Sequence, residues 1–310
     1  MNMEKSNDYQ EVKRELYACA AQHGLHLNTE AFEVNESGLD FFVAFVRDNN
    51  GQAWVLRKPR RSDVWERALN ERNVLKAVAP RISVAVPDWR ICTPDLIAYP
   101  LLAGNPVATV DPAGSGYVWR FPQEALGDTF YDSLAETLAA LHCVDHDEAM
   151  RSGVRRKTPA ETREAFAANI EEVRQKFDIP AKLLDRWMSW LTTDSYWPEF
   201  SVLHHGDLHP PHILVDDNQR MTGLIDWTEA EIADPGKDFV ILYALFGEKG
   251  LQDILNRYER MGGRTWYRMK EHIAEQWAAY PALVAKFALT TRKEDDMNMA
   301  RGMINSWNID

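Results

Sequence analysis

Long apolar runs and cysteines are scarce in this sequence, and their scarcity excludes several classes of protein. No apolar stretch approaches the roughly 20 residues that cross a bilayer, and residues 1–9 are polar, without the apolar core of a signal peptide. The three cysteines, Cys19, Cys92 and Cys143, are far apart and form no Cys-x-x-Cys pair, which argues against a disulfide framework or a structural zinc site. We therefore expect a cytoplasmic protein with no membrane partner and three buried cysteines.

Clusters of basic side chains are scarce as well. The formal net charge is −12, and the densest basic run, residues 57–61, is followed by acidic residues. Binding to nucleic acid needs a broad basic surface, so we expect no nucleic-acid partner, and a monomer is our default. The acidic balance has two explanations: it confers solubility, or it helps to attract a cationic small molecule.

The first hundred residues predict a small mixed lobe. Apolar runs at 41–46 and 53–56 flank Asn49-Asn50-Gly51, a pattern typical of a β-hairpin. Around this hairpin we predict, in chain order, a helix that ends near Gly24, a helix from an N-cap at Ser62 to about residue 79, and strands at 88–91 and 96–101.

The remaining sequence predicts a larger, mainly helical lobe. Helix-like stretches cover 130–142, 158–177, 181–191 and 236–262, with short strands only at 213–215 and 223–225. The turn-rich stretch 103–106 separates the two parts. We therefore predict an α+β, two-lobed chain, with a β-rich N-lobe over 1–102 and a helical C-lobe over 103–310.

A pair of aspartates carries the strongest chemical signal. Asp207 lies in the run His-His-Gly-Asp-Leu-His-Pro-Pro-His at 204–212, and Asp226 follows the short strand at 223–225. Phosphoryl transfer needs a carboxylate that orients the attacking hydroxyl, oxygen ligands for magnesium, and a cation on the phosphates. Either motif alone is typical of a turn. Their order and spacing after a β-rich lobe predict the catalytic base at Asp207 and a metal ligand at Asp226.

These residues belong to a resemblance that extends over most of the chain. The chain resembles the aminoglycoside phosphotransferase and choline kinase superfamily, and within it the macrolide 2′-phosphotransferases. The resemblance implies a protein-kinase-like fold. The matching segments are VNESGLDF from Val34, WVLRKPRR from Trp54, AVPDWR from Ala85, LIAYPLL from Leu96, WPEFSVLHHGDLHPPHILVD from Trp197, GLIDWTEAEIADPGKD from Gly223, FGEKGL from Phe246 and YERMGGR from Tyr258.

The resemblance implies a nucleotide site in the N-lobe. Arg57 stands where the phosphate-binding cation of the family lies, and Glu71 would pair with it; strand alternation points Lys58 the other way. The alternative for Arg57 and Glu71 is solvated surface charge. Residues 34–40, with Ser37 and Gly38, would cover the phosphates, and the link that would contact the purine comprises Tyr99, Pro100, Leu101 and Leu102.

His212 departs from the wider superfamily, which has asparagine five residues after the catalytic aspartate. Imidazole is a softer ligand than an amide oxygen and suits zinc better than magnesium. The macrolide branch resembles this sequence in having histidine here. We predict that His212 ligates the metal, with donation to a phosphate oxygen as the alternative.

Further residues receive supporting or substrate-binding roles. His205, Asp234 and Asp238 would brace loops and a helix N-terminus. Aromatic and acidic residues near the C-terminal half would wall the acceptor pocket together with Asp207, although aromatics at helical spacing also pack in cores and the glutamates are also expected in solvent. This predicted acceptor set comprises Trp227, Glu229, Glu231, Tyr267, Trp277 and Tyr280.

The resemblance implies a macrolide kinase. It would transfer the γ-phosphate of a purine nucleoside triphosphate, GTP in preference to ATP, to the 2′-hydroxyl of a macrolide antibiotic, with Mg²⁺ as cofactor. The runner-up is a related kinase acting on an aminoglycoside or another hydroxylated amine. A third hypothesis is a catalytically inactive kinase-like binding domain, against which the presence of Asp207, Asp226, Arg57 and Glu71 argues.

Overall fold

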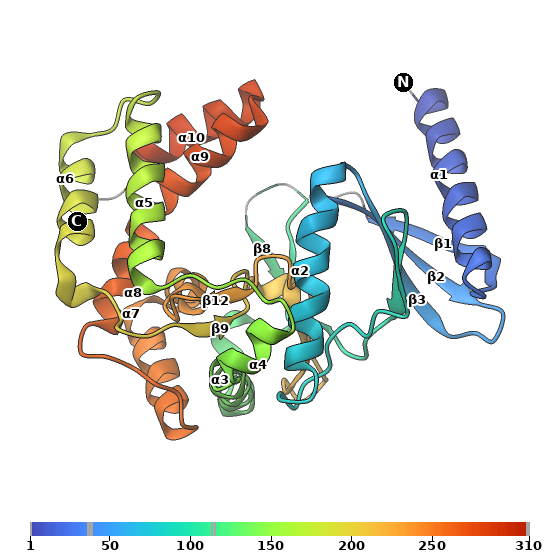
Figure 1. The fold of residues 1–310 in the computed structure, drawn as a ribbon, viewed down its shortest axis with the longest axis horizontal. Coiled ribbons are helices and arrows are strands. Elements are labelled where there is room, and N and C mark those ends of the chain that lie inside the picture. Colours follow the sequence, from blue (N-terminus) through green and yellow to red (C-terminus); the bar gives the residue numbers. More distant parts are fainter. Residues whose placement is uncertain (1, 36–39, 113, 115, 308–310) are drawn as a thin grey trace.

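The computed structural model describes residues 2–35, 40–112, 114 and 116–307. One end of the molecule is an antiparallel sheet with a helix on each face, and the other is mainly helical (Figure 1). The fold is therefore α+β, as predicted. Ser37 and Gly38, predicted to cover the phosphates, lie outside the described residues.

The sheet has five antiparallel strands in the order β1-β2-β3-β5-β4. The predicted hairpin is confirmed: Asp48 N and Gly51 N donate to Gln52 O and Asp48 O across the Asn49-Asn50-Gly51 turn, and Gly51 takes a positive φ of 85°. The strands are β1 (Leu27–Asn35), β2 (Phe41–Asp48), β3 (Ala53–Pro59), β4 (Ile91–Cys92) and β5 (Ile97–Pro100).

Side-chain alternation along β3 divides the sheet into two apolar faces. Leu56 packs under α1 (Asn2–Gln22), whereas Val55 packs under α2 (Ser62–Val78). Because successive strand residues point to opposite faces, Arg57 lies on the α2 side and Lys58 on the α1 side, where it pairs with Glu15. The predicted difference between these two cations is confirmed.

Three local predictions need correction. The polar alternation of 27–35 forms strand β1, which the sequence did not reveal. The strand expected at 88–91 is reduced to Ile91–Cys92, and before it only Arg90 N still donates toward β5, to Ala98 O. Ser62 is the first helical residue and not the N-cap; Arg61 occupies that position, and its side chain pairs with Asp40 and Asp63 instead of capping the helix.

The mainly helical part follows β5, and the predicted helices are present. The helix expected at 158–177 begins with a capping box between Thr158 and Glu161. The helix expected at 236–262 is kinked at Gly247. No helix of the described residues is long and apolar enough to cross a membrane. The helices are α3 (Asp128–His142), α4 (His146–Arg151), α5 (Pro159–Arg174), α6 (Ala181–Thr192), α7 (Lys237–Arg260), α8 (Met269–Ala278), α9 (Tyr280–Thr291) and α10 (Glu294–Ser306).

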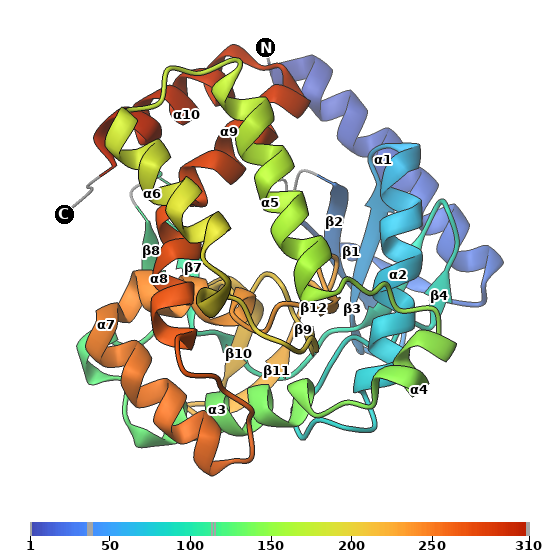
Figure 2. The ribbon, with the colours of Figure 1, turned by 60° about the vertical axis from the view of Figure 1, so that its left-hand side comes forward.

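Short strands in the helical part hold the loops that carry the aspartates (Figure 2). Strand β9 pairs with β12, β10 pairs with β6 and β11, and β7 with β8 forms a separate hairpin. Short 3-10 turns occur at Gln123–Ala125, Asp194–Tyr196 and Pro210–His212. The strands are β6 (Asn105–Pro106), β7 (Ala108–Val110), β8 (Tyr117–Trp119), β9 (Val202–His204), β10 (Ile213–Val215), β11 (Met221–Leu224) and β12 (Glu231–Ala233).

Large aromatic side chains fill the core of the helical part. Trp187 and Trp190 on α6 are buried, and the indole of Trp187 donates to Ala278 O at 2.7 Å. The prediction of three buried cysteines is wrong, because Cys19 and Cys92 are half-buried and Cys143 is exposed.

We predict that Trp187→Ala lowers the free energy of unfolding by about 3–5 kcal/mol, because it leaves a cavity and an unpaired carbonyl. Chemical denaturation monitored by circular dichroism measures the change. Met188→Ala is the matched control on the same helix, since Met188 is 42% exposed whereas Trp187 is fully buried, and it should cost far less stability, about 0.5 kcal/mol. Equal losses in the two variants would contradict this account of the core.

Candidate active site

The loop between β9 and β10 brings Asp207 to the surface while its neighbours stay buried. His205 is fully buried, and 32% of the Asp207 side chain is exposed. Both flanking strands are paired, β9 with β12 and β10 with β11, so the ends of the loop are fixed. The loop therefore presents one carboxylate from a rigid support.

The buried carboxylate of Asp238, at the start of α7, holds the main chain of this loop. It accepts hydrogen bonds from His205 N at 2.9 Å and Gly206 N at 2.7 Å, and the Nε2–H of His142 donates to it at 3.1 Å. Burial acts to raise the pKa of Asp238, but the hydrogen bond from His142 and the neighbouring histidines outweigh burial and leave the pKa well below the usual range. Asp238 is therefore a charged anchor for the loop.

Asp234 makes a second buried anchor four residues earlier. Its carboxylate accepts from Gly236 N at 2.8 Å and from the side chains of His272 and Gln276, each at 2.6 Å. Burial raises the pKa of Asp234 and the contact with His272 lowers it, so that the net shift is downward. Asp234 thus ties the start of α7 to α8.

Glycine is required at position 206. Its φ is +82°, and a Cβ atom there would lie 2.5 Å from the carbonyl oxygen of Glu229. Any other residue would have to displace backbone. The close approach brings the loop after Asp226 against the loop that carries Asp207.

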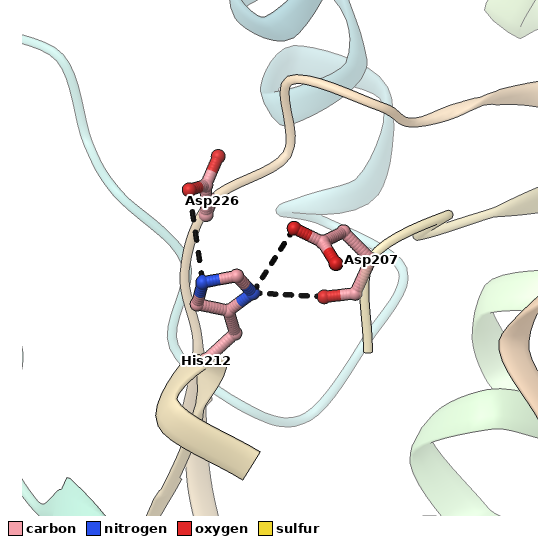
Figure 3. Close-up of side chains that lie close together, drawn as sticks. All are labelled: Asp207, His212 and Asp226. Carbon is pink, nitrogen blue, oxygen red and sulfur yellow. Dashed lines mark hydrogen bonds and ion pairs between the residues drawn. The ribbon is translucent and has the colours of Figure 1, made fainter. Parts of the chain in front are cut away.

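Asp207, His212 and Asp226 converge, with one possible ligand atom from each lying within 4.8 Å of the others (Figure 3). The Nδ1–H of His212 donates to the backbone carbonyl of Asp207 at 2.8 Å, and Nε2 lies 3.7 Å from a carboxylate oxygen of Asp226. The hydrogen bond at Nδ1 leaves Nε2 as the nitrogen with a free lone pair. These side chains can therefore offer a metal both carboxylate and imidazole ligands.

A buried ion pair lies behind Asp226. Arg57 donates to Glu71 at 2.7 Å, and Thr228 Oγ1 lies 3.0 Å from Glu71 and 2.9 Å from Asp226. Burial acts to lower the pKa of Arg57, but Glu71 and other nearby acidic groups outweigh it and raise that pKa. Partial burial raises the pKa of Asp226, and the charge of Arg57 lowers it, with a net decrease. Arg57, Glu71 and Thr228 thus connect the sheet to Asp226 through an ion pair and hydrogen bonds.

The residues predicted to contact a purine lie at the end of β5 and just after it, and Tyr99 among them is close to the Arg57–Glu71 ion pair. Tyr99 is buried, and burial raises its pKa to about 12 despite the nearby charge of Arg57. Leu101 N donates to Ala53 O, and Leu101 is 45% exposed. Pro100 and Leu102 flank it and are partly buried.

A cavity of about 410 Å³ opens beside Asp207. One wall is the loop that carries Asp207, and the opposite walls come from α5, α7, α8, α9 and α10. Trp277 and Tyr280 stack on each other at 5.1 Å and both line the cavity, as does Glu229. The other lining residues are Phe166, Gly206, Leu208, His209, Lys237, Val240, Ile241, Gln276, Leu283, Val284, Phe287 and Met299.

Three of the predicted acceptor residues lie outside this cavity. The prediction for Trp227 is wrong, because its indole is completely buried, donates to Leu224 O and packs on His205. Glu231 pairs with Lys157, and Tyr267 is 95% exposed to solvent. Neither Glu231 nor Tyr267 lines the cavity.

Arg67 of α2 connects the sheet side with the cavity side. It forms ion pairs with Asp40, which directly precedes β2, and with Glu229. The carboxylate of Glu229 at the cavity is therefore partly neutralised by a cation from α2.

A model of the phosphotransferase enzyme family matches residues 31–272. The chain belongs to this family. Among curated relatives, the uncharacterized protein YcbJ of Bacillus subtilis is 47% identical over 286 residues, which cover 92% of this chain and 94% of the relative. Viomycin phosphotransferase of Streptomyces vinaceus is 31% identical over 106 residues, 33% of this chain and 35% of the relative.

Solved structures of two macrolide 2′-phosphotransferases are similar over almost the whole phosphotransferase chain. The type I enzyme is 39% identical with a TM-score of 0.87, covering 96% of this chain and 97% of that one. MphH of Brachybacterium faecium is 39% identical with a TM-score of 0.83, covering 94% and 97%. APH(2″)-IIIa, solved with GDP and kanamycin, shares the fold at 21% identity and a TM-score of 0.72, covering 90% and 93%.

Several residues of this phosphotransferase site escaped the sequence analysis. His142 and His272 reach their aspartates across 96 and 38 positions, so no local pattern reveals them. Thr228 lies two residues after Asp226, the spacing over which an aspartate side chain commonly forms a local hydrogen bond in a turn. That spacing was the available signal.

We predict that Asp238→Asn lowers the free energy of unfolding at pH 7 by about 2–4 kcal/mol, because at least one buried N–H loses its acceptor. Since folding lowers the pKa of Asp238, its contribution is present above the ordinary pKa of about 3.9 and is lost as pH falls through the folded-state value. Denaturation at several pH values should show the difference shrinking in acid.

Asp217→Asn is the matched control, because 89% of the Asp217 side chain is exposed and it pairs only at the surface with Arg120. A deficit of the same size in both variants, or one that grows in acid, would contradict the anchoring role of Asp238.

Proposed function

We propose that this phosphotransferase transfers the γ-phosphate of a purine nucleoside triphosphate to the 2′-hydroxyl of a macrolide amino sugar and so inactivates the antibiotic. The observation that carries the proposal is the cavity beside Asp207, whose far walls are mostly apolar and aromatic. A large apolar lactone needs such walls. The two macrolide 2′-phosphotransferases that are 39% identical over almost the full length support the same acceptor.

The composition of the cavity also favours a macrolide over the alternative acceptor, an aminoglycoside or another hydroxylated amine. Of the described residues that line it, Asp207 and Glu229 carry carboxylates, and Lys237 carries a positive charge. A polycationic aminoglycoside would need several converging carboxylates. A macrolide amino sugar brings one ammonium group, which would share the carboxylate of Glu229 with Arg67.

Asp207 is the proposed base. Its carboxylate lies at the cavity wall and would accept the proton of the acceptor hydroxyl while orienting that oxygen toward the phosphate. Because the transition state of phosphoryl transfer is loose, positioning and charge supply most of the rate. The anchors at Asp238 and Asp234 supply the positioning.

Asp226 and His212 are the proposed ligands of Mg²⁺. A carboxylate is the ligand that this cation prefers, and the free lone pair on Nε2 of His212 points toward Asp226, which fits a shared ion despite the softer nitrogen donor. A bound Mg²⁺ would neutralise charge on the phosphates. Arg57, held by Glu71, would add a positive charge at the same place.

We propose that residues 1–102 hold the nucleotide and that 103–310 hold the acceptor. Ser37 and Gly38 would cover the phosphates, and the purine would lie against the link from Tyr99 through Pro100 and Leu101 to Leu102, with GTP preferred. Exposure of the Leu101 side chain at the end of the sheet supports a flat apolar contact there. A flat contact of this kind suits guanine and adenine alike, so the proposed preference for GTP rests on the family resemblance and not on this contact.

We expect erythromycin to be phosphorylated with GTP and Mg²⁺, and more slowly with ATP, while kanamycin is a poor acceptor. Mass spectrometry and a coupled nucleotide assay measure the products and rates. Asp207→Asn should lower kcat by about 10²- to 10⁴-fold with little change in nucleotide affinity, because the fold and the metal ligands persist.

Phosphorylation of kanamycin but of no macrolide would establish the alternative acceptor. Nucleotide binding without Mg²⁺-dependent turnover on any acceptor, or with water, would indicate an inactive kinase-like binding domain and contradict the proposal.

We expect His212→Asn to retain most of the Mg²⁺-supported activity, since an amide oxygen is a hard ligand, whereas His212→Leu should lose at least about tenfold. Titration of activity with Mg²⁺, after removal of metal by EDTA, separates weaker binding from slower turnover. If His212→Leu matches the wild type at every Mg²⁺ concentration, His212 is not a ligand.

A further inference from the structure

A relay of three side chains, in which a hydrogen-bond donor contacts a histidine and the histidine faces an aspartate, occurs twice in the interior of the described part of the chain and once at the cavity. In each interior case, a donor side chain binds Nδ1 of a histidine whose Nε2 faces an aspartate. Tyr258 donates to His142 at 2.8 Å, and His142 Nε2 donates to Asp238. Such a relay fixes both the tautomer and the orientation of the imidazole.

The second interior relay has tryptophan as the donor. Trp190 Nε1 donates to Nδ1 of His272 at 3.1 Å, and His272 Nε2 donates to Asp234 at 2.6 Å. Both interior relays hold carboxylates that anchor the catalytic loop or its neighbour. Their function is structural: in each, the fixed imidazole donates a hydrogen bond that holds the aspartate carboxylate in one orientation.

The third relay ends on the proposed base. Tyr117 is hydrogen-bonded to Nδ1 of His209, and Nε2 of His209 lies 3.4 Å from Oδ1 of Asp207. A carboxylate only accepts, so the proton of the neutral imidazole belongs on Nε2, and the phenol is the donor to Nδ1. The separation of 3.4 Å is slightly beyond a normal hydrogen bond, so the imidazole and the carboxylate are close neighbours whose contact is not a fully formed hydrogen bond.

The β7–β8 hairpin is built to hold Tyr117 at this place. Tyr117 and Trp119 share one face of β8, while Val118 between them is largely exposed. Tyr117 packs edge-on against Trp119, which in turn contacts Phe246 of α7. Burial and the nearby charge of Asp207 raise the pKa of Tyr117 to about 12, so the phenol keeps its proton and stays a donor.

We propose that Tyr117 and His209 are positioning residues that orient the carboxylate of Asp207 toward the acceptor hydroxyl from the cavity side. The opposite carboxylate oxygen faces His212, 3.5 Å from Nδ1. The base is thereby held between a histidine on the metal side and a histidine on the acceptor side. This inference rests on the role of Asp207 proposed above.

The test is a kinetic comparison with the acceptor that the full-length enzyme phosphorylates fastest. Tyr117→Phe keeps the ring and removes the donor, so kcat should fall by roughly three- to tenfold, the effect of one hydrogen bond, with KM values for acceptor and nucleotide unchanged. Tyr131→Phe is the matched control, because Tyr131 is a half-buried tyrosine of α3 that packs on Phe130 and Phe246. It should leave kcat unchanged.

Variants of His209 separate positioning from a general effect on folding. His209→Gln keeps an N–H group of similar reach and should retain more of kcat than His209→Leu. Because Tyr117 acts through His209, adding Tyr117→Phe to His209→Leu should cost nothing further. A kcat for Tyr117→Phe equal to that of the control, or full additivity with His209→Leu, would overturn the proposal.

A spectroscopic measurement is independent of the acceptor. In ¹⁵N-histidine spectra, assigned with His209→Gln, His209 should show the Nε2–H tautomer in the wild type and a mixture of tautomers in Tyr117→Phe. Identical spectra would overturn the relay even if no acceptor were found. If Asp207→Asn stays active, the proposed function fails; if that variant is inactive while Tyr117→Phe is normal, only this inference fails.

Discussion

The buried carboxylate of Asp238 determines the conformation of the loop that carries Asp207. It accepts from two consecutive main-chain N–H groups and from His142, so both of its oxygens are in use. Without it, the backbone of His205 and Gly206 would have buried donors and no acceptor, which is costly. The position of Asp207 therefore depends on α7 and on the end of α3 as much as on its own strand.

From this fixed loop the site extends in two directions. Toward the sheet lie His212 and Asp226, and behind Asp226 the Thr228 hydroxyl connects to Glu71 and Arg57. Toward the helical part lie His209 and the aromatic walls of the cavity. The charges are concentrated on the first side and the apolar surface on the second, which matches a triphosphate and a large lactone.

The sequence predicted those parts of the site that depend on local patterns. Strand alternation distinguished Arg57 from Lys58, and the spacing of Asp207 and Asp226 indicated two carboxylates near each other. Prediction from the sequence was wrong or incomplete where a residue's role depends on a contact with a residue far away along the chain. Trp227 has an aromatic ring suited to binding, yet the turn at Asp226, with its φ of 64°, directs the indole into the core. Strand β1 was missed because one face of an edge strand can be polar, and His142 because its partner is 96 positions away.

A crystal structure of the complex with a non-hydrolysable GTP analogue, Mn²⁺ and erythromycin would locate the metal and the acceptor relative to Asp207. We expect the anomalous peak of Mn²⁺ at Asp226 and His212, and the amino-sugar 2′-hydroxyl within hydrogen-bond distance of Asp207, in the cavity beside Trp277. Erythromycin bound away from Asp207, or a metal that contacts neither Asp226 nor His212, would contradict the proposed function.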